Sequence, residues 1–142
     1  MKRIYVLFAL AFTFSVQSFA QVKTPSASAS AKVTQTVGLT DFTVQYSRPS
    51  ARGREIMGAL VPFGEVWRTG ANQATKITLS GDASIEGQTL KKGSYAILTT
   101  PNKKSWEVRF YTYEKSSWSS YKESKPALAV EVKSKKSGMK IE

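Results

Sequence analysis

Apolar and polar residues alternate along most of the chain from Val33 onward. The alternation is strongest where Phe42, Val44 and Tyr46 are interleaved with polar neighbours. Successive side chains of a β-strand point to opposite faces of a sheet, so this period of two predicts half-buried strands. No segment after Ala20 shows the apolar spacing of about 3.6 residues that indicates a helix. We therefore expect an all-β fold, either an antiparallel β-sandwich or a partly open barrel.

Turn-forming residues separate the alternating segments and predict antiparallel hairpins. Residues 38–41 connect the first two strands, residues 86–88 form a tight turn, and residues 101–104 connect the hairpin with the clearest pattern. Short strands in close succession are typical of the all-β class. The expected strands cover residues 33–37, 42–47, 76–80, 83–85, 89–90, 94–100, 105–113 and 128–133.

The N-terminus has the pattern of a signal peptide. Lys2 and Arg3 precede an apolar run over residues 4–14, and small residues at Ser18 and Ala20 predict cleavage after Ala20. A transmembrane anchor is the alternative, but this run is well short of the roughly 18 apolar residues that a membrane span requires. We expect a protein that is periplasmic or secreted after cleavage and has no membrane span in its mature form.

One domain follows the signal peptide. Residues 21–31 contain Pro25 and an alternation of Ser and Ala over residues 26–31, and they lack large side chains after Val22, so we expect a flexible leader there. The chain of 142 residues leaves room for a single domain of ordinary size, which we place at residues 32–142.

Composition excludes most familiar catalytic machinery. The chain has no Cys and no His, which excludes disulfides, a thiol nucleophile, an imidazole base and His-ligated zinc. The acidic residues are scattered without a calcium-binding loop, so we expect no metal and no cofactor. Lys and Arg number 21 against 10 Asp and Glu, a formal net charge of +11 that favours either anionic partners or simply solubility. We expect no nucleic acid partner, because the Lys residues are spread along the chain and export is predicted.

The alternation breaks between Tyr46 and Thr75. Residues 46–72 contain four of the nine Gly and two of the five Pro, which excludes one uninterrupted strand or helix. Large apolar residues in this span argue against disorder, and long structured loops in small domains are often functional. The segment is also rich in Arg, whereas no Lys lies between Lys32 and Lys76. A planar guanidinium suits multiple hydrogen bonds to carboxylates, phosphates or carbonyls better than an ammonium does.

Two interpretations of this Arg-rich connection stay open. In the first, the guanidiniums bind Glu55, Glu65 and loop carbonyls and hold the connection against the sheet. In the second, they line a recess for an anionic or polyhydroxyl small molecule or an envelope glycan. The candidate ligand-binding residues are Tyr46, Arg48, Arg52, Arg54, Trp67, Arg68, Thr69 and Asn72.

The alternative function is a hydrolase that acts on cell-envelope glycans through Glu55 or Glu65. A glycosidase needs two carboxyl groups that face one cleft, and one of them must stay protonated as a general acid. Both glutamates have Arg neighbours in the sequence, which stabilise the charged carboxylate instead. We therefore assign no catalytic residue and expect a non-catalytic binding or structural domain. The oligomeric state is left open by the sequence.

Aromatic residues crowd into residues 106–121 and raise the possibility of a carbohydrate platform. Trp118 and Tyr121 are its best candidates, because they lie in a segment without clear alternation. Strand alternation places Tyr111 and Tyr113 on the solvent-facing side of an amphipathic strand, opposite the core.

The connection also carries a family resemblance. The residues concerned are Tyr46-Ser47-Arg48-Pro49, Gly53-Arg54, Leu60-Val61-Pro62 and Val66-Trp67-Arg68-Thr69-Gly70-Ala71-Asn72. With Leu39-Thr40-Asp41 upstream and Gly93-x-Tyr95 downstream, the chain resembles an exported bacterial family catalogued as domain of unknown function twenty-nine eleven. The resemblance implies an exported β-rich domain and no known activity. Members of the family continue beyond the end of this chain, which implies missing C-terminal strands and a last strand with one unpaired side.

Overall fold

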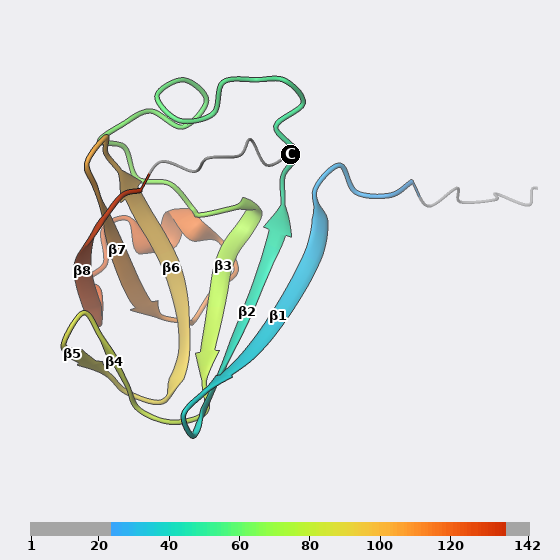
Figure 1. The fold of residues 1–142 in the computed structure, drawn as a ribbon. Coiled ribbons are helices and arrows are strands. Elements are labelled where there is room, and N and C mark those ends of the chain that lie inside the picture. The colour runs from blue at the N-terminus through green and yellow to red at the C-terminus, as the bar shows by residue number, and fades with distance from the viewer. Residues whose placement is uncertain (1–23, 136–142) are drawn as a thin grey trace, which may run out of the picture.

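A curved antiparallel sheet forms most of the molecule (Figure 1). The computed structural model describes residues 24–135. The sheet has six strands in the order β1-β2-β3-β6-β7-β8 and is not closed into a barrel, because β1 and β8 lie at its two edges. These strands are β1 (Ala29–Val37), β2 (Thr40–Arg48), β3 (Ala71–Leu79), β6 (Gly93–Pro101), β7 (Ser105–Thr112) and β8 (Leu128–Lys133). The predicted all-β fold is confirmed.

Two smaller elements complete the fold. Strands β4 (Ala83–Ile85) and β5 (Gln88–Leu90) form a separate hairpin, and η1 (Trp118–Tyr121) is a short 3₁₀ turn. The β4–β5 hairpin turns through Glu86 and Gly87, which both have positive φ angles of 49° and 77°. This is the backbone of a type I′ turn, whose twist matches that of the strands it joins.

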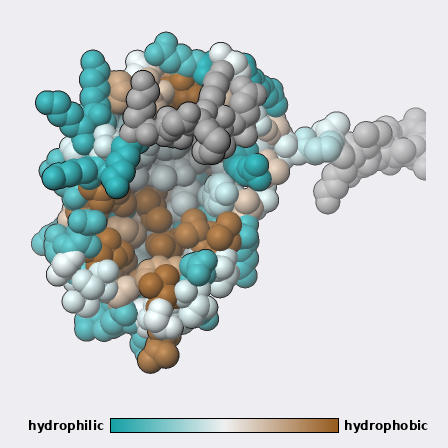
Figure 2. Space-filling view, in the orientation of Figure 1, coloured by the Kyte–Doolittle hydropathy of each residue, from teal (hydrophilic) through white to brown (hydrophobic). Residues whose placement is uncertain are grey.

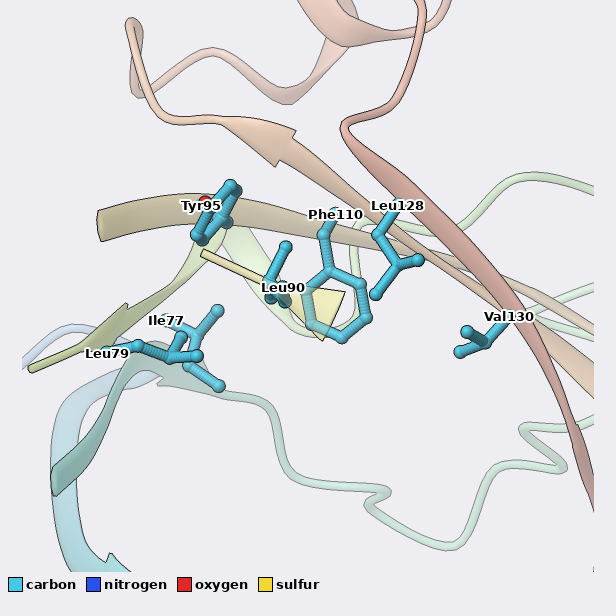
Figure 3. Close-up of a cluster of buried hydrophobic side chains, with 7 residues drawn as sticks. All are labelled: Ile77, Leu79, Leu90, Tyr95, Phe110, Leu128 and Val130. Atoms are coloured by element: carbon cyan, nitrogen blue, oxygen red, sulfur yellow. The ribbon is translucent and has the colours of Figure 1, made fainter. Parts of the chain in front are cut away.

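The main core lies on one face of the sheet and is closed by the β4–β5 hairpin. Leu90 of this hairpin is 2% exposed and packs among side chains of the large sheet (Figure 3). Alternation explains the cluster, since strands such as β3 and β8 contribute every second residue to this face. The buried members are Ile77, Leu79, Leu90, Tyr95, Phe110, Leu128 and Val130.

A second cluster covers the opposite face, which the sequence pattern had placed in solvent. Tyr111 is 4% exposed and packs against Tyr121, with their ring centroids 5.6 Å apart. The Tyr121 hydroxyl accepts hydrogen bonds from the backbone N–H groups of Glu114 and Lys115 and donates one to the Lys115 carbonyl, at 3.0, 2.8 and 2.6 Å. These bonds tie Tyr121 to the residues that follow β7, and the Ala74 N–H of β3 donates to the Ser116 carbonyl of the same segment at 2.9 Å. The prediction of a solvent-facing Tyr111 is therefore wrong, because a non-periodic segment covers that face.

Two strand boundaries differ from those expected. β1 begins at Ala29, so the last three residues of the expected leader pair with residues 46–48 of β2. β3 begins at Ala71, five residues earlier than predicted, and a register shift in its pairing with β2 lies between Gln45 and Ser47. Both differences arise because strands pair through backbone groups, which side-chain alternation does not report.

The two ends of the chain limit what the structure describes. The predicted signal peptide, its cleavage after Ala20 and the alternation at residues 138–142 lie outside the described residues. Within residues 24–135, β8 pairs with β7 alone and forms one edge of the sheet. No helix in this described part is long and apolar enough to cross a membrane.

Candidate functional site

The Arg-rich connection between β2 and β3 passes over one end of the sheet (Figure 1). Its second half is hydrogen-bonded to β6: the Trp67 and Thr99 backbones exchange bonds of 2.7 and 2.9 Å. The Gly64 N–H donates to the Pro101 carbonyl at 2.9 Å. Its first half closes on itself, since the Val61 N–H donates to the Ile56 carbonyl at 2.8 Å. The connection is thus an ordered structure held by backbone bonds.

The two halves of the connection enclose a pocket of about 520 Å³. We call it the Arg68 pocket. Its walls combine apolar side chains with two guanidiniums and one amide, and no acidic residue lines it. The lining residues are Ser28, Pro49, Ser50, Ala51, Arg54, Ile56, Leu60, Val61, Trp67, Arg68, Gly70, Ala71 and Asn72.

Arg54 holds one wall of the pocket. Its Nε donates to the Ala51 carbonyl at 2.9 Å, and its Nη2 donates to the Ser50 carbonyl at 2.8 Å. These are loop carbonyls of the kind that the first interpretation expected a guanidinium to satisfy. Arg54 therefore stabilises the turn at residues 50–54 while its side chain faces the pocket.

Arg68 makes a different set of contacts. Its guanidinium carbon lies 5.8 Å from the centroid of the Trp118 ring, and the Lys122 Nζ lies 4.7 Å from the same ring. The Arg68 Nε is buried and has no hydrogen-bond partner within the described residues. A buried charged donor without a partner is rare and costly, so it marks a place where an acceptor would be favourable.

Left-handed backbone positions Arg68 and its neighbours. Thr69 has a φ angle of 58° and Asn72 one of 59°. This conformation is uncommon for a β-branched residue such as Thr and is held here by the surroundings. The Thr69 carbonyl accepts a bond of 2.9 Å from the Thr75 hydroxyl, and the Thr69 and Thr99 hydroxyl oxygens lie 3.0 Å apart. Arg68 and Asn72, at the two ends of this turn, both line the Arg68 pocket.

Gly70 lies within this turn because no larger residue fits. A Cβ atom at this position would lie 2.9 Å from the Thr75 hydroxyl oxygen and 3.3 Å from the Ser47 carbonyl oxygen. Any side chain would therefore push the connection away from the start of β3 and the end of β2. Gly70 and Ala71, at this close approach, line the Arg68 pocket.

The structure brings half of the predicted ligand-binding residues together. Arg54, Trp67, Arg68 and Asn72 line the Arg68 pocket. Thr69 adjoins it and shapes the turn, but is not among the lining residues.

The remaining predicted residues lie apart from the pocket. Tyr46 lines a separate pocket of about 200 Å³, where Lys76 approaches the Tyr113 ring at 4.8 Å. Arg48 and Arg52 are exposed, and neither makes an ion pair within residues 24–135. Neither of them lines the Arg68 pocket.

Sequence reasoning did not single out the apolar walls or Ser28. In the sequence, Ile56, Leu60 and Val61 argue against disorder, and Leu60 and Val61 also belong to the family resemblance; in the structure all three line the pocket. Their presence in a Gly- and Pro-rich span was a usable signal for a recess. Ser28 lines the pocket because β1, which begins at the next residue, pairs with β2. The residues around Ser28 carry no sequence pattern that predicts this position.

Glu55 and Glu65 neither pair with the guanidiniums of the connection nor line its pocket. Both are exposed, and neither lines the Arg68 pocket. The ion pairs found within the described residues join Lys91 to Asp82 and Arg109 to Glu107, away from the connection. The predicted pairing of the connection's guanidiniums with Glu55 and Glu65 is therefore wrong, because both carboxylates face solvent. Residues 24–135 hold no group of three or more acidic residues suited to a metal ion.

These features define an all-β domain with a cationic pocket built by one long connection. The chain belongs to the family described as protein of unknown function (DUF2911), whose model matches residues 28–142. The resemblance seen in the connection is thereby confirmed, and the matched segment contains every residue that lines the pocket. No curated protein and no solved structure matches the chain.

Proposed function

We propose that this protein is an exported, non-catalytic binding protein of the cell envelope, and that the Arg68 pocket holds a small anionic ligand. The observation that carries the proposal is Arg68, which lines the pocket together with a second guanidinium and no carboxylate and whose buried Nε has no partner within the described residues. A carboxylate or phosphate oxygen would satisfy this donor and balance the charge.

The walls of the pocket indicate the rest of the ligand. Trp67 and Leu60 supply apolar surface, while the Asn72 amide supplies both a donor and an acceptor. The volume of about 520 Å³ lies within the range of roughly 300–1,000 Å³ that is usual for small-molecule pockets. A sugar acid or a similarly sized anion with a partly apolar ring fits this description, because Trp and sugar rings stack well.

The export part of the proposal rests on the N-terminal pattern of charge, apolar run and small residues. It is tested by expressing the whole chain in a bacterial host and determining the N-terminus of the periplasmic or medium fraction. Processing should yield a protein that begins at Gln21, and Ala20→Arg should block it. Full-length protein retained in the cytoplasm would contradict export.

Ligand binding is tested by thermal shift with glucuronic acid, N-acetylmuramic acid and inorganic phosphate, and with glucose as a neutral control. A ligand that binds only the folded state raises the melting temperature with its concentration. We expect an increase with at least one anion and none with glucose.

Matched variants connect the shift to the pocket. Arg68→Ala should abolish the increase, whereas Arg52→Ala removes the same charge from the exposed part of the connection and should retain it. An equal shift in both variants would show that the anion binds by net charge alone. No shift with any of the anions would overturn the assignment of this ligand class.

A further inference from the structure

The outer edge of β1 is long and accessible. Of its nine residues only Ala31 is partly covered, and Val33 and Val37 are 53% and 60% exposed. Lys32 is the single charged residue of the strand. Edge strands of this length usually carry several charges, a proline or a bulge that prevents pairing with another chain.

The backbone groups that point outward from β1 can be identified. The Ser80 N–H donates to the Asp41 carbonyl at 3.1 Å, so the backbone of Asp41 faces away from β1. Thr36 lies directly opposite Asp41, and its own N–H and C=O therefore face outward. Because this direction alternates along the strand, the outward groups belong to Ser30, Lys32, Thr34 and Thr36.

We propose that the β1 edge pairs with the β1 edge of a second copy of this chain, antiparallel and centred on Val33. Val33 is the midpoint of Ala29–Val37, so this register pairs all nine residues with their counterparts. It places Lys32 opposite Thr34 and Ser30 opposite Thr36, so that outward backbone groups meet each other. Val33 lies opposite Val33 of the second copy.

Neighbouring registers are less favourable. Centring on Lys32 sets two ammonium groups directly opposite each other, which destabilises a strand pair. Centring on Thr34 shortens the overlap and places Val33 opposite Gln35. A register centred between Val33 and Thr34 places residues whose N–H and C=O groups face outward opposite residues whose groups face β2. The hydrogen bonds between the two strands could then not form.

Side-chain polarity also favours a second copy. Val33 lies opposite Val44 of β2, which packs on the main core. Pairing about a two-fold axis would bring both apolar faces onto the same side of one continuous sheet. Figure 2 shows apolar residues gathered across one face of the molecule with hydrophilic residues around them. The proposed pair would extend that face and cover Val33.

A single cysteine tests the register directly, because the chain has no Cys of its own. Residues opposite each other in a non-hydrogen-bonded pair have Cα atoms about 4.5 Å apart, within disulfide range. Val33→Cys should form a disulfide-linked dimer under mild oxidation. Gln35→Cys lies on the same face, but its two copies would be about 13 Å apart and should stay monomeric on a non-reducing gel. Equal cross-linking of both variants, or none of folded Val33→Cys, would overturn the proposal.

A second measurement avoids dependence on the disulfide. Sedimentation of the purified protein should give about twice the monomer mass at high concentration. Thr34→Pro removes an outward N–H without breaking a backbone bond to β2, so it should yield monomers. It also loses the contact of 3.0 Å between the Thr34 and Thr43 hydroxyl oxygens, which Thr34→Ala loses equally, so the melting temperature of its monomer fold should match that of Thr34→Ala. Thr34→Ala keeps the N–H and should remain dimeric. If the wild-type protein stays monomeric at every concentration, the proposed self-pairing of β1 is wrong.

Discussion

Arg68 lies over the ring of Trp118, with its guanidinium carbon 5.8 Å from the ring centroid. This contact joins the connection after β2 to the segment after β7, two irregular stretches that are fifty residues apart in the sequence. Trp118 begins η1, whose last residue Tyr121 is buried against the sheet. The pocket and the cover of the second face are therefore parts of one arrangement.

Arg68→Ala should change the free energy of unfolding only slightly. The lost cation–π contact is worth about 0.5–1 kcal/mol. Removing a buried donor without a partner offsets part of that loss. Urea unfolding of wild type and variant measures the difference. A loss several times larger would mean that Arg68 mainly holds the connection in place and would weaken its assignment as a ligand-binding residue.

Tyr121→Phe should destabilise the fold by about 1–3 kcal/mol, because it leaves the N–H groups of Glu114 and Lys115 without their acceptor. Tyr113→Phe is the matched control. Its ring can keep the contact with Lys76, and no hydrogen bond of its hydroxyl is found within the described residues. Denaturant unfolding of the two variants should therefore separate them clearly. Equal effects would contradict the role of the Tyr121 hydroxyl.

Glu86→Asn should stabilise the protein by about 0.5–1 kcal/mol. Glu86 has a φ angle of 49° and precedes Gly87, and Asn adopts this left-handed conformation more readily than Glu. Glu86→Ala provides the control, since Ala gains nothing in this conformation. The melting temperatures of the three proteins measure the effect, and an increase with Ala as large as that with Asn would refute the turn argument.

The stability of the β7 strand should depend on pH through Glu107. Hydrogen bonds from the Arg109 guanidinium lower the pKa of Glu107 below its ordinary value, against the opposing effect of partial burial. A carboxyl with a lowered folded-state pKa stabilises the fold above its unfolded-state pKa. This contribution is lost as the pH falls through the folded-state value.

Urea unfolding between about pH 6 and pH 3 tests this dependence, since the ordinary Glu pKa is about 4.3. Arg109→Gln should be less stable than wild type at the upper end, and the difference should shrink toward the lower end. A difference that stays constant with pH would show that Arg109 stabilises the strand through packing and not through the carboxylate.

Local pattern was sufficient for the strands and hairpins. Phe42 and Val44 alternate with polar residues because β2 has one face toward the core, and the turn at Gly38-Leu39 follows from chemistry within four residues. Such signals depend on neighbours in the sequence, so they were visible without coordinates. The starts of β1 at Ala29 and of β3 at Ala71 could not be predicted in this way, since backbone pairing there does not require side-chain alternation.

The concentration of Arg in the connection was also visible in the sequence, but its consequences were not. Arg52 and Arg68 are the same residue type in the same segment, yet they differ in the structure. Arg52 is exposed, whereas Arg68 has a buried Nε and its guanidinium lies over the Trp118 ring. What distinguishes them is contact with β6 and with the segment after β7, which lie far away along the chain.

The sequence by itself determined the all-β class, most of the strands and the segment in which a site was to be sought. Only the tertiary structure decided which guanidiniums share a pocket, that Glu55 and Glu65 stand outside it, and that Tyr111 is covered. The physical reason is that alternation and turn chemistry act over a few residues. Burial and convergence, in contrast, depend on which distant segments the sheet brings together.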